Sequence, residues 1–434
     1  MQSLLNKLDD LSRRDFAKYL AKSFLGVGFG LPLLGSRVEG SDLALADGSS
    51  TGGTAKRVIY LYLSGGMSHL DTLDPKTDND VRGPVESLQT NVDGILVSEH
   101  MKKLATQMDK VSLVRSLTSN QGAHERGRYL MRTGYTQRGT IRHPSTGAWA
   151  VRLAGKRNRT LPGYVTIGGD SRHPGAGFME AKYAPLPIGD PKAGLQHSKL
   201  PKGVTMDTLR KRLQMANRLD AAFQARYDQR AVRAYTDAYR DAITLMNSDD
   251  LLAFDINREA PATRDAYGDN AFGQGCLLAR RLAERDVRFI EVSSGGWDTH
   301  QNNFDRIRDK AGELDQALGT LLADLDRRGL LEETLVVVAT EFGRTPKINQ
   351  NTGRDHYPKA FSCLLAGGGV KGGYVHGGTD QQGGEVIEKP VTVPDFNATI
   401  AAALGLPQEQ IITSDSGRPF TVASKGEPIA EIFA

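Results

Sequence analysis

The sequence predicts an α/β protein built on a doubly wound, mostly parallel sheet with helices on both faces. Two patterns support this fold class. Apolar runs of strand length alternate along the chain with longer segments of helical period. The apolar runs are continuous rather than alternating, which is typical of strands that are covered on both faces. A sheet enclosed between two helical layers follows from these patterns.

Six apolar runs are expected to form strands, because each has strand length and leads into a loop. They are residues 57–66, 111–117, 163–169, 287–296, 334–343 and 361–369. Two helices are expected between them, at residues 270–286 and 312–329. The second helix has one apolar face before its stop at Gly329. That face consists of Leu314, Leu318, Leu321, Leu322 and Leu325.

One large domain is expected over residues 57–434, preceded by a linker at 47–56. Residues 204–250 are rich in Arg, Ala and Gln and have a helical period. We interpret residues 204–262 as a helical insertion on the sheet rather than a separate domain. No repeat of solenoid period is present in the sequence.

The N-terminus resembles a twin-arginine export signal. The stretch SRRDFAKYL (Ser12–Leu20) precedes an apolar, glycine-containing run, and Ala17 replaces the usual leucine of the consensus. The consensus residues present are Arg13, Arg14, Phe16 and Lys18. A membrane anchor is the alternative, but the run is too short and glycine-rich to span a bilayer of about 30 Å. We therefore expect a signal peptide at residues 1–46, with cleavage after Ala46. This predicts passage through the twin-arginine translocase, a periplasmic or extracellular location and no stable membrane span after cleavage.

Charge and cysteine content exclude some classes of function. The formal net charge is only +4 over 434 residues, and no Lys/Arg-rich block is interleaved with aromatic residues, which argues against nucleic acid as a partner. The two cysteines, Cys276 and Cys363, lie in apolar surroundings and are expected to be buried free thiols. One disulfide between them stays open as an alternative, but a cysteine-based zinc site is excluded.

Acidic and imidazole side chains follow the predicted strands. In open α/β sheets, reactive groups gather in loops at the carboxyl ends of strands, and paired glycines such as Gly295 and Gly296 allow tight turns there. The residues expected to hold a divalent cation are Asp71, Asp298, His300, Glu341, Asp355 and His356. Mixtures of Asp and His suit zinc, manganese or iron. Any single Asp–His motif is commonly a solvated pair, but its recurrence after several strands favours a shared site.

Four long segments carry a resemblance to a known family. They are residues 65–76, 267–304, 324–349 and 353–373. They are similar to a large bacterial family of twin-arginine-exported proteins of unknown function, distantly related to the sulfatase and alkaline-phosphatase superfamily. The similarity extends over nearly the whole chain. It implies a sheet of the alkaline-phosphatase/sulfatase-like type.

The superfamily resemblance also implies roles for individual residues. Arg128 and Thr133–Gly134 fall at the spacing of the sulfatase nucleophile box, which places His124 where the nucleophile would be. Glu341 falls at the position of a metal-binding Asp of the superfamily. His356 and Lys359 resemble a His and a Lys that lie further along the superfamily's sequences. Three positions depart from the superfamily pattern. Ser64 stands where the superfamily has a metal-binding Asp, His124 where it has the nucleophile and Phe342 where it has a His ligand. An imidazole at position 124 can act as a metal ligand, a general base or a phosphoryl acceptor.

Two functional hypotheses follow. The first is an exported, metal-dependent hydrolase of phosphate or sulfate esters, with zinc, manganese or calcium as its ion. The residues expected to act on the anionic ester are His124, Arg128, Arg344 and Lys359. Surface ion pairing is the alternative for the two arginines. The second hypothesis is a non-catalytic envelope protein that binds an anionic glycan or a partner protein, because the expected nucleophile is replaced.

Overall fold

The computed structural model describes residues 53–77, 79–196, 198, 203–205, 207–208, 211 and 241–434. The predicted signal peptide at 1–46, most of the linker and most of the helical insertion lie outside these residues. The end of the insertion is described and contains two short 3₁₀ helices, η3 (Asp249–Phe254) and η4 (Ile256–Arg258). No helix in the described part of the chain is long and apolar enough to cross a membrane.

A nine-stranded sheet forms the centre of the described structure, in the order β12-β4-β11-β8-β1-β7-β5-β6, with β15 also paired to β4. Its strands are β1 (Arg57–Leu63), β4 (Val111–Thr118), β5 (Tyr164–Ile167), β6 (Leu186–Ile188), β7 (Phe289–Ser294), β8 (Thr334–Thr340), β11 (Phe361–Ala366), β12 (Tyr374–His376) and β15 (Val391–Thr392). Each of the six predicted runs overlaps one of these strands. Only β11 pairs antiparallel to its neighbours within this sheet. The predicted α/β class and mostly parallel sheet are therefore confirmed.

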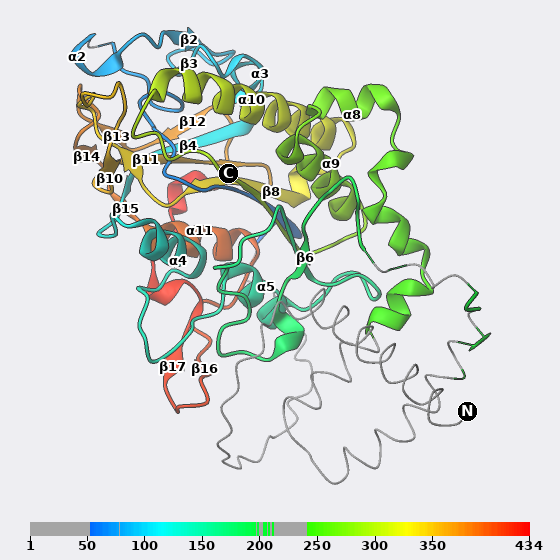
Figure 1. Cartoon of the computed structure of the whole chain (residues 1–434). Helices are drawn as coiled ribbons and strands as arrows, with labels where there is room; N and C mark the ends of the chain where they lie inside the picture. Colours follow the sequence, from blue (N-terminus) through cyan, green and yellow to red (C-terminus); the bar gives the residue numbers. More distant parts are fainter. Residues whose placement is uncertain are drawn as a thin grey trace, which may run out of the picture.

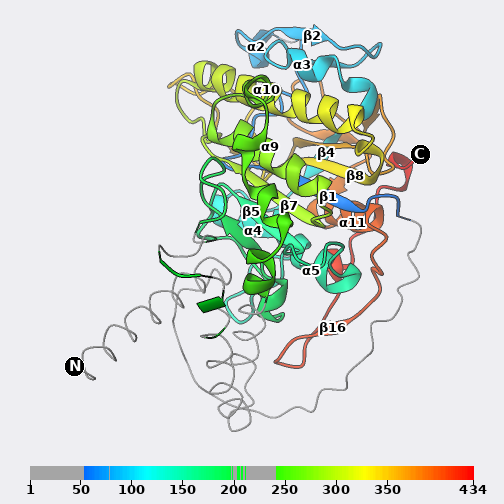
Figure 2. The same cartoon turned by 90° about the vertical axis from the view of Figure 1, so that its right-hand side faces the viewer.

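Helices cover both faces of the sheet (Figures 1 and 2). One layer contains α9 (Ala271–Glu284) and α10 (Asn303–Arg327), and the other contains α4 (His124–Thr133), α5 (Thr146–Ala154) and α11 (Val393–Ala403). The side chains of β1 alternate between the two layers, because successive residues of a strand point to opposite faces. Ile59, Leu61 and Leu63 join the core beneath α9 and α10, whereas Val58, Tyr60 and Tyr62 join the core on the other side.

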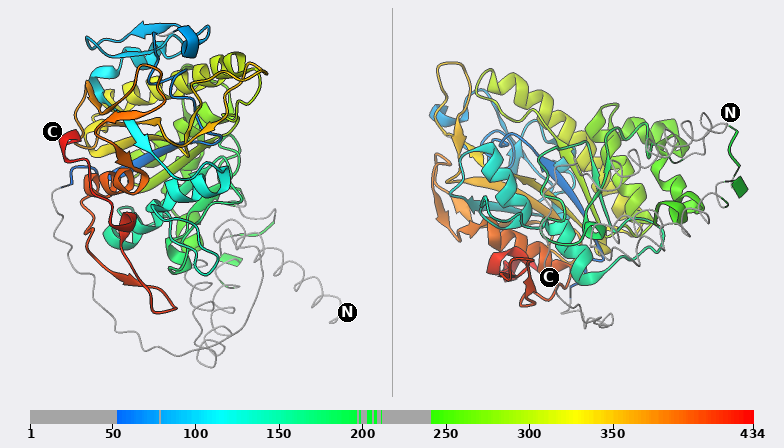
Figure 3. Two further views of the ribbon diagram at one scale, coloured as in Figure 1. Left: turned by 90° about the vertical axis from the view of Figure 1, so that its left-hand side faces the viewer. Right: turned by 60° about the horizontal axis from the view of Figure 1, so that its bottom comes forward.

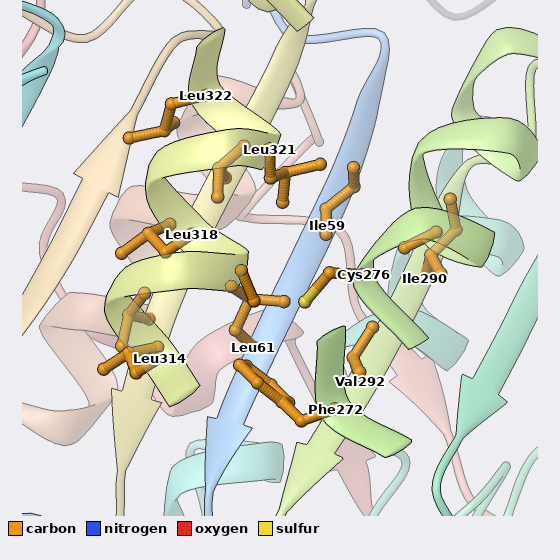
Figure 4. Packing of buried hydrophobic residues seen from close by; sticks show 14 of the residues in the cluster. Ile59, Leu61, Phe272, Cys276, Ile290, Val292, Leu314, Leu318, Leu321 and Leu322 are labelled. Atoms are coloured by element: carbon orange, nitrogen blue, oxygen red, sulfur yellow. The ribbon is translucent and has the colours of Figure 1, made fainter. Parts of the chain in front are cut away.

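The packing of α10 on the sheet follows the predicted apolar face. Its leucines at positions 314, 318, 321, 322 and 325 are all buried. Figure 4 shows Leu321 beside Ile59 of β1, and Leu318 and Leu61 belong to the same core. Burying a leucine side chain contributes about 1.5–3 kcal/mol, so this face accounts for much of the attachment of α10.

The two cysteines lie on opposite sides of the sheet. Cys276 of α9 belongs to the core shown in Figure 4, and Cys363 of β11 belongs to the other core. Both are free and buried, and burial raises the pKa of the Cys363 thiol to about 12. The prediction of free thiols is confirmed.

Smaller elements surround the sheet, and Figure 3 shows the β16–β17 hairpin extending away from it. The remaining helices are α2 (Asn79–Arg82), α3 (Lys102–Ala105) and α8 (Pro261–Tyr267). The remaining strands are β2 (Ser87–Gln89), β3 (Leu96–Ser98), β9 (Gly343–Arg344), β10 (His356–Tyr357), β13 (Gly378–Thr379), β14 (Val386–Glu388), β16 (Ile412–Thr413) and β17 (Pro419–Phe420).

The register of the central strands brings their carboxyl ends level. Leu63, the last residue of β1, pairs with Ser294 of β7 and with Thr340 of β8. The loops that follow these three strands therefore leave the sheet at one edge. Strand β11 runs in the opposite direction, so the segment that precedes it, including β10, reaches the same edge.

Candidate metal centre

Four loops at this edge bring acidic and imidazole side chains together. Asp298 follows β7, Glu341 directly follows β8, and His356 lies on β10. His124 is the first residue of α4, the helix that follows β4. The strand-end rule that predicted a shared site therefore places these four residues at one edge of the sheet.

Asp298 is the centre of the cluster. Its Oδ2 atom lies 3.2 Å from the Nε2 atom of His124. Its Oδ1 atom lies 3.1 Å from His300 Nε2 and 3.4 Å from His356 Nε2. The Nε2 atoms of His300 and His356 are 3.0 Å apart. Three imidazole rings thus present the same nitrogen to one carboxylate.

The other ring nitrogen of each histidine contacts an oxygen. The pairs are His124 Nδ1 with Glu341 Oε1 at 2.8 Å, His356 Nδ1 with the Gly122 carbonyl at 2.8 Å, and His300 Nδ1 with Asp355 Oδ1 at 2.7 Å. Carbonyl and carboxylate oxygens only accept hydrogen bonds, so each Nδ1 atom carries the proton. In the neutral rings, the Nε2 lone pairs therefore face Asp298.

This arrangement fits a metal ion. Lone pairs that face each other and a carboxylate repel unless a cation lies between them, and metal-bound imidazoles commonly donate their second N–H to an oxygen. The Nε2 atom of His124 is buried and has no hydrogen-bond partner among the described residues. Donor atoms of His124, Asp298 and His356 all lie within 4.8 Å of one another. Ligands about 2.0–2.1 Å from a tetrahedral ion lie about 3.4 Å apart, close to the separations around Asp298.

The donor set also indicates which ions suit the site. Two or three imidazole nitrogens with one carboxylate match zinc, manganese or iron. Calcium prefers six to eight oxygen ligands, so this set of donors does not favour it.

The ionisation of the cluster is set by its neighbours. Burial alone would raise the pKa of the Asp298 carboxyl, but the hydrogen bond and charge of Arg344, together with His124 and His300, lower it to about 2. Burial lowers the pKa of His356 in spite of its bond to the Gly122 carbonyl. Asp298 is therefore an anion at neutral pH and His356 is neutral, which are the forms that bind metal.

Arg344, predicted to bind an anionic ester, is instead buried within the protein. Its Nε atom donates to the Gly66 carbonyl at 2.9 Å and its Nη1 atom to the Arg354 carbonyl at 3.0 Å. Its Nη2 atom donates to the Gly65 carbonyl and, at 2.5 Å, to Asp298 Oδ1. The structure thus places Arg344 beneath the cluster, where it joins two loops and holds Asp298.

Glu341, predicted as a metal ligand, lies behind His124. Its carboxylate is fully buried and accepts hydrogen bonds from the Gly65 amide at 2.8 Å and the Tyr62 hydroxyl at 2.9 Å, besides that from His124. These donors leave Glu341 as a support for the His124 ring. Tyr62 was not predicted as a site residue, because a tyrosine inside an apolar run is typical of a core position.

Asp71, the other predicted ligand from the loop after β1, is placed in a separate buried ion pair. Its Oδ2 atom lies 2.8 Å from Arg354 Nε and also accepts from Ser68 and Asn303. Its Oδ1 atom accepts from Arg354 Nη2 at 3.0 Å. Its oxygens are thus occupied by neighbouring donors, and Asp71 does not contact Asp298.

The two remaining predicted cations differ in position. Arg128 lies one helical turn after His124, is half-buried and donates its Nε–H to the His124 carbonyl at 3.2 Å. Its terminal nitrogens have no acceptor among the described residues. Lys359 is exposed in the loop between β10 and β11, and no ion pair joins it to the described residues.

The glycine after β1 permits the close approach of the loops. Gly65 has a φ of +126°, and a Cβ atom at this position would lie 2.4 Å from the Asp298 backbone nitrogen. A side chain would therefore displace the loop that carries Asp298. At Gly65 both the backbone conformation and the available space therefore require glycine.

Comparison with solved structures gives several distant similarities. The lipoteichoic acid synthase LtaP from Listeria monocytogenes is 9% identical with a TM-score of 0.41, covering 82% of this chain and 74% of that one. The PsFucS1 sulfatase from Pseudoalteromonas sp. is 14% identical with a TM-score of 0.35, covering 82% and 68%. A protein in the alkaline phosphatase superfamily from Vibrio parahaemolyticus is 10% identical with a TM-score of 0.38, covering 96% and 78%. All three TM-scores lie below 0.5, so only the residues of this chain decide what its site can bind.

Sequence comparison identifies the family. A search of curated proteins gives no match. A family model described as "Protein of unknown function (DUF1501)" matches residues 55–433, which include every strand of the central sheet and the whole histidine cluster. The chain therefore belongs to the DUF1501 family of proteins of unknown function.

Proposed function

We propose that this protein is a metal-dependent hydrolase of phosphate or sulfate esters. The observation that carries the proposal is the convergence of three Nε2 atoms on Asp298 while each Nδ1 atom contacts an oxygen. His124, His356 and Asp298 would hold one divalent ion. Such an ion lowers the pKa of a bound water and polarises an ester oxygen.

His300 and Asp355 are suited to proton transfer. His300 is the most exposed imidazole of the cluster, with 42% of its side chain accessible, and Asp355 fixes its Nδ1–H. Its Nε2 atom would accept a proton from the attacking water, and Asp355 would stabilise the resulting imidazolium. The ester oxygen that leaves would take a proton from the same atom.

The first turn of α4 is suited to an anionic ester. The helix begins at His124, and no side chain of the described residues caps its N-terminus. Its unbonded amide groups therefore lie at the same end as the His124 ring and favour negative charge. Arg128 lies one turn further and has terminal nitrogens available for the oxygens of a phosphate or sulfate. Lys359 adds an exposed positive charge in the loop after β10.

Attack by water, without a covalent intermediate, is the mechanism that this geometry supports. The sequence resemblance implies that His124 stands where the superfamily has its nucleophile, but its Nδ1 atom contacts Glu341 and its Nε2 atom faces Asp298. Neither nitrogen is then available for phosphoryl transfer.

Export by the twin-arginine route is part of the proposal, supported by the N-terminal sequence alone. We expect the mature N-terminus to follow Ala46. N-terminal sequencing of protein from the periplasm or medium would show this, and an R13K/R14K variant should accumulate inside the cell. Efficient export of that variant would exclude the twin-arginine route.

The hydrolase proposal is tested by metal analysis and turnover together. Purified mature protein should contain close to one zinc, manganese or iron ion per chain and hydrolyse an aryl phosphate or an aryl sulfate. Asp298→Asn should lose both properties. His100→Gln, a half-buried histidine outside the cluster, is the matched control and should keep them. Metal binding without turnover of either ester would contradict hydrolysis and favour a non-catalytic binder of anionic glycans.

A further inference from the structure

Tyr62 connects the core of the sheet to the histidine cluster. Its side chain is fully buried on β1, and its hydroxyl donates to Glu341 Oε2 at 2.9 Å. Glu341 Oε1 in turn contacts His124 Nδ1 at 2.8 Å. A continuous chain of hydrogen bonds therefore runs from Tyr62 through Glu341 to His124.

The orientation of His124 depends on the position of the Glu341 carboxylate. Rotation about the last bond of Glu341 would move Oε1 away from His124 and release its Nδ1–H. The Gly65 amide holds Oε1 at 2.8 Å, and Tyr62 holds the opposite oxygen, so the plane of the carboxylate is fixed at both ends. An acceptor fixed in this way keeps the proton on Nδ1 and leaves Nε2 as the metal-binding atom.

We propose that Tyr62 is a positioning residue that fixes Glu341, and through it the orientation and tautomer of His124, for metal binding. The inference rests on the proposed metal-dependent function and extends it to a residue outside the cluster. Tyr62 does not touch the ion or the ester. Its effect is expected in metal affinity rather than in the fold.

The Tyr62 ring is itself held rigidly. The guanidinium carbon of Arg132 lies 3.9 Å from the centre of the ring, a cation–π contact. Arg132 donates to Glu291 Oε1 at 2.8 Å and to Asp170 Oδ2 at 2.6 Å. The β1 backbone is hydrogen-bonded to strands on both sides. The hydroxyl therefore has little freedom to leave Glu341.

Tyr60 offers a matched control. It lies two residues earlier on β1 and on the same face, and the two rings are stacked with centroids 6.3 Å apart. Both side chains are buried, but the Tyr60 hydroxyl has no hydrogen-bond partner among the described residues. Tyr60→Phe and Tyr62→Phe each remove one buried hydroxyl group from the same face of β1. Of these two hydroxyls, only that of Tyr62 contacts Glu341.

The first readout is zinc affinity, measured by competition with a chromophoric chelator. Tyr62→Phe keeps the ring and its contact with Arg132, and we expect its Kd for zinc to rise about 10-fold to 100-fold, the usual effect of losing a residue that supports a ligand. Tyr60→Phe should stay within about two-fold of the wild type. In a Glu341→Gln background, Tyr62→Phe should raise the Kd for zinc by a much smaller factor than it does in the wild type, because both changes act through one carboxylate. Wild-type affinity in Tyr62→Phe would overturn the inference.

The second readout does not need metal. Histidine ring ¹⁵N spectra are recorded at about pH 9, above the ordinary imidazole pKa of about 6.5. They should show His124, assigned from His124→Ala, with its proton on Nδ1 in the wild type and in Tyr60→Phe. Tyr62→Phe should show a mixture of tautomers. If the wild type bound no zinc, the proposed function would fail. The spectra would still decide the role of Tyr62, since an unchanged tautomer in Tyr62→Phe would contradict it.

Discussion

The Nε2 atoms of His300 and His356 lie 3.0 Å apart, although the Nδ1 atom of each ring already contacts an oxygen acceptor. In the neutral rings, neither Nε2 atom carries a proton to donate to the other. Both point to the Asp298 carboxylate, which lies 3.1 Å from one and 3.4 Å from the other. A cation removes the repulsion among these three groups.

Metal should therefore stabilise the folded protein. A ligand present at 100 times its Kd adds about 2.7 kcal/mol to the free energy of unfolding, so zinc or manganese should raise the Tm by several degrees. Differential scanning calorimetry of chelator-treated protein, with and without added ion, measures the effect. His356→Ala should lose the shift, and His100→Gln should retain it. An equal shift in His356→Ala would place the bound metal elsewhere.

The buried Asp71–Arg354 pair should matter for stability and not for metal content. Both side chains are fully buried, so Asp71→Asn leaves the Arg354 guanidinium without its counter-charge, at a cost of about 3–5 kcal/mol. Urea unfolding measures this change. Glu86→Gln, which breaks the exposed Arg82–Glu86 pair, should cost less than about 1 kcal/mol.

The metal content of Asp71→Asn distinguishes a structural ion pair with Arg354 from a role of Asp71 as a metal ligand. Folded Asp71→Asn protein should contain as much metal as the wild type. A proportional loss of metal in protein that remains folded would make Asp71 a ligand after all.

The two glycines beside the cluster should respond differently to alanine. Gly65→Ala imposes a φ of +126° on alanine and places a Cβ atom 2.4 Å from the Asp298 backbone nitrogen. We expect a loss of at least about 1–3 kcal/mol in stability and a marked loss of zinc affinity. Gly295→Ala, for which no atom lies within 4 Å of the added Cβ, should leave both within error. Equal effects at the two positions would contradict the proposed fit between the loops.

Glu291 should make stability fall in acid. Burial alone would raise the pKa of its carboxyl, but Arg132 and His173 lower it to about 2. The ordinary value in the unfolded chain is about 4.3, so ionised Glu291 contributes about 3 kcal/mol at neutral pH. That contribution is present above about pH 4.3 and is lost as the pH falls towards 2.

Urea unfolding at a series of pH values tests this assignment. Glu291→Gln should be less stable than the wild type at pH 7 and should show a shallower decline between about pH 4.3 and pH 2. Glu86→Gln should follow the wild-type curve. An unchanged slope in Glu291→Gln would assign the acid sensitivity to other carboxyl groups.

The sequence predicts the sheet well, because its strands are continuous apolar runs that differ clearly from the helical segments. TLVVVAT at β8 and RVIYLYL at β1 can be recognised without knowledge of their partners. The direction of β11 could not be predicted, since an apolar run looks the same in either orientation. As a consequence, Gly368, which follows β11, donates its amide hydrogen to the Leu331 carbonyl at 2.9 Å, just before the start of β8 and at the edge opposite the histidine cluster.

The residues of the site could be predicted only where they lie next to a strand end, because the strand end then fixes their place at one edge of the sheet. Asp298, His300 and His356 follow or precede strands at one edge, and the structure brings them together. Asp71 leaves the same edge, but its neighbour Arg354 comes from a loop 283 residues away, and no local pattern indicates that pairing. Tyr62 lies inside an apolar strand, so its contact with Glu341 depends on the register between β1 and β8, which the sequence does not show.

The most direct measurement is the position of the metal ion, given by anomalous diffraction at the zinc edge from crystals of the zinc-loaded protein. The proposed centre predicts one ion about 2.0–2.2 Å from His124 Nε2, His356 Nε2 and an oxygen of Asp298, with Glu341 behind His124 and out of contact with the ion. An ion bound at another place, with these three side chains free of metal, would contradict it.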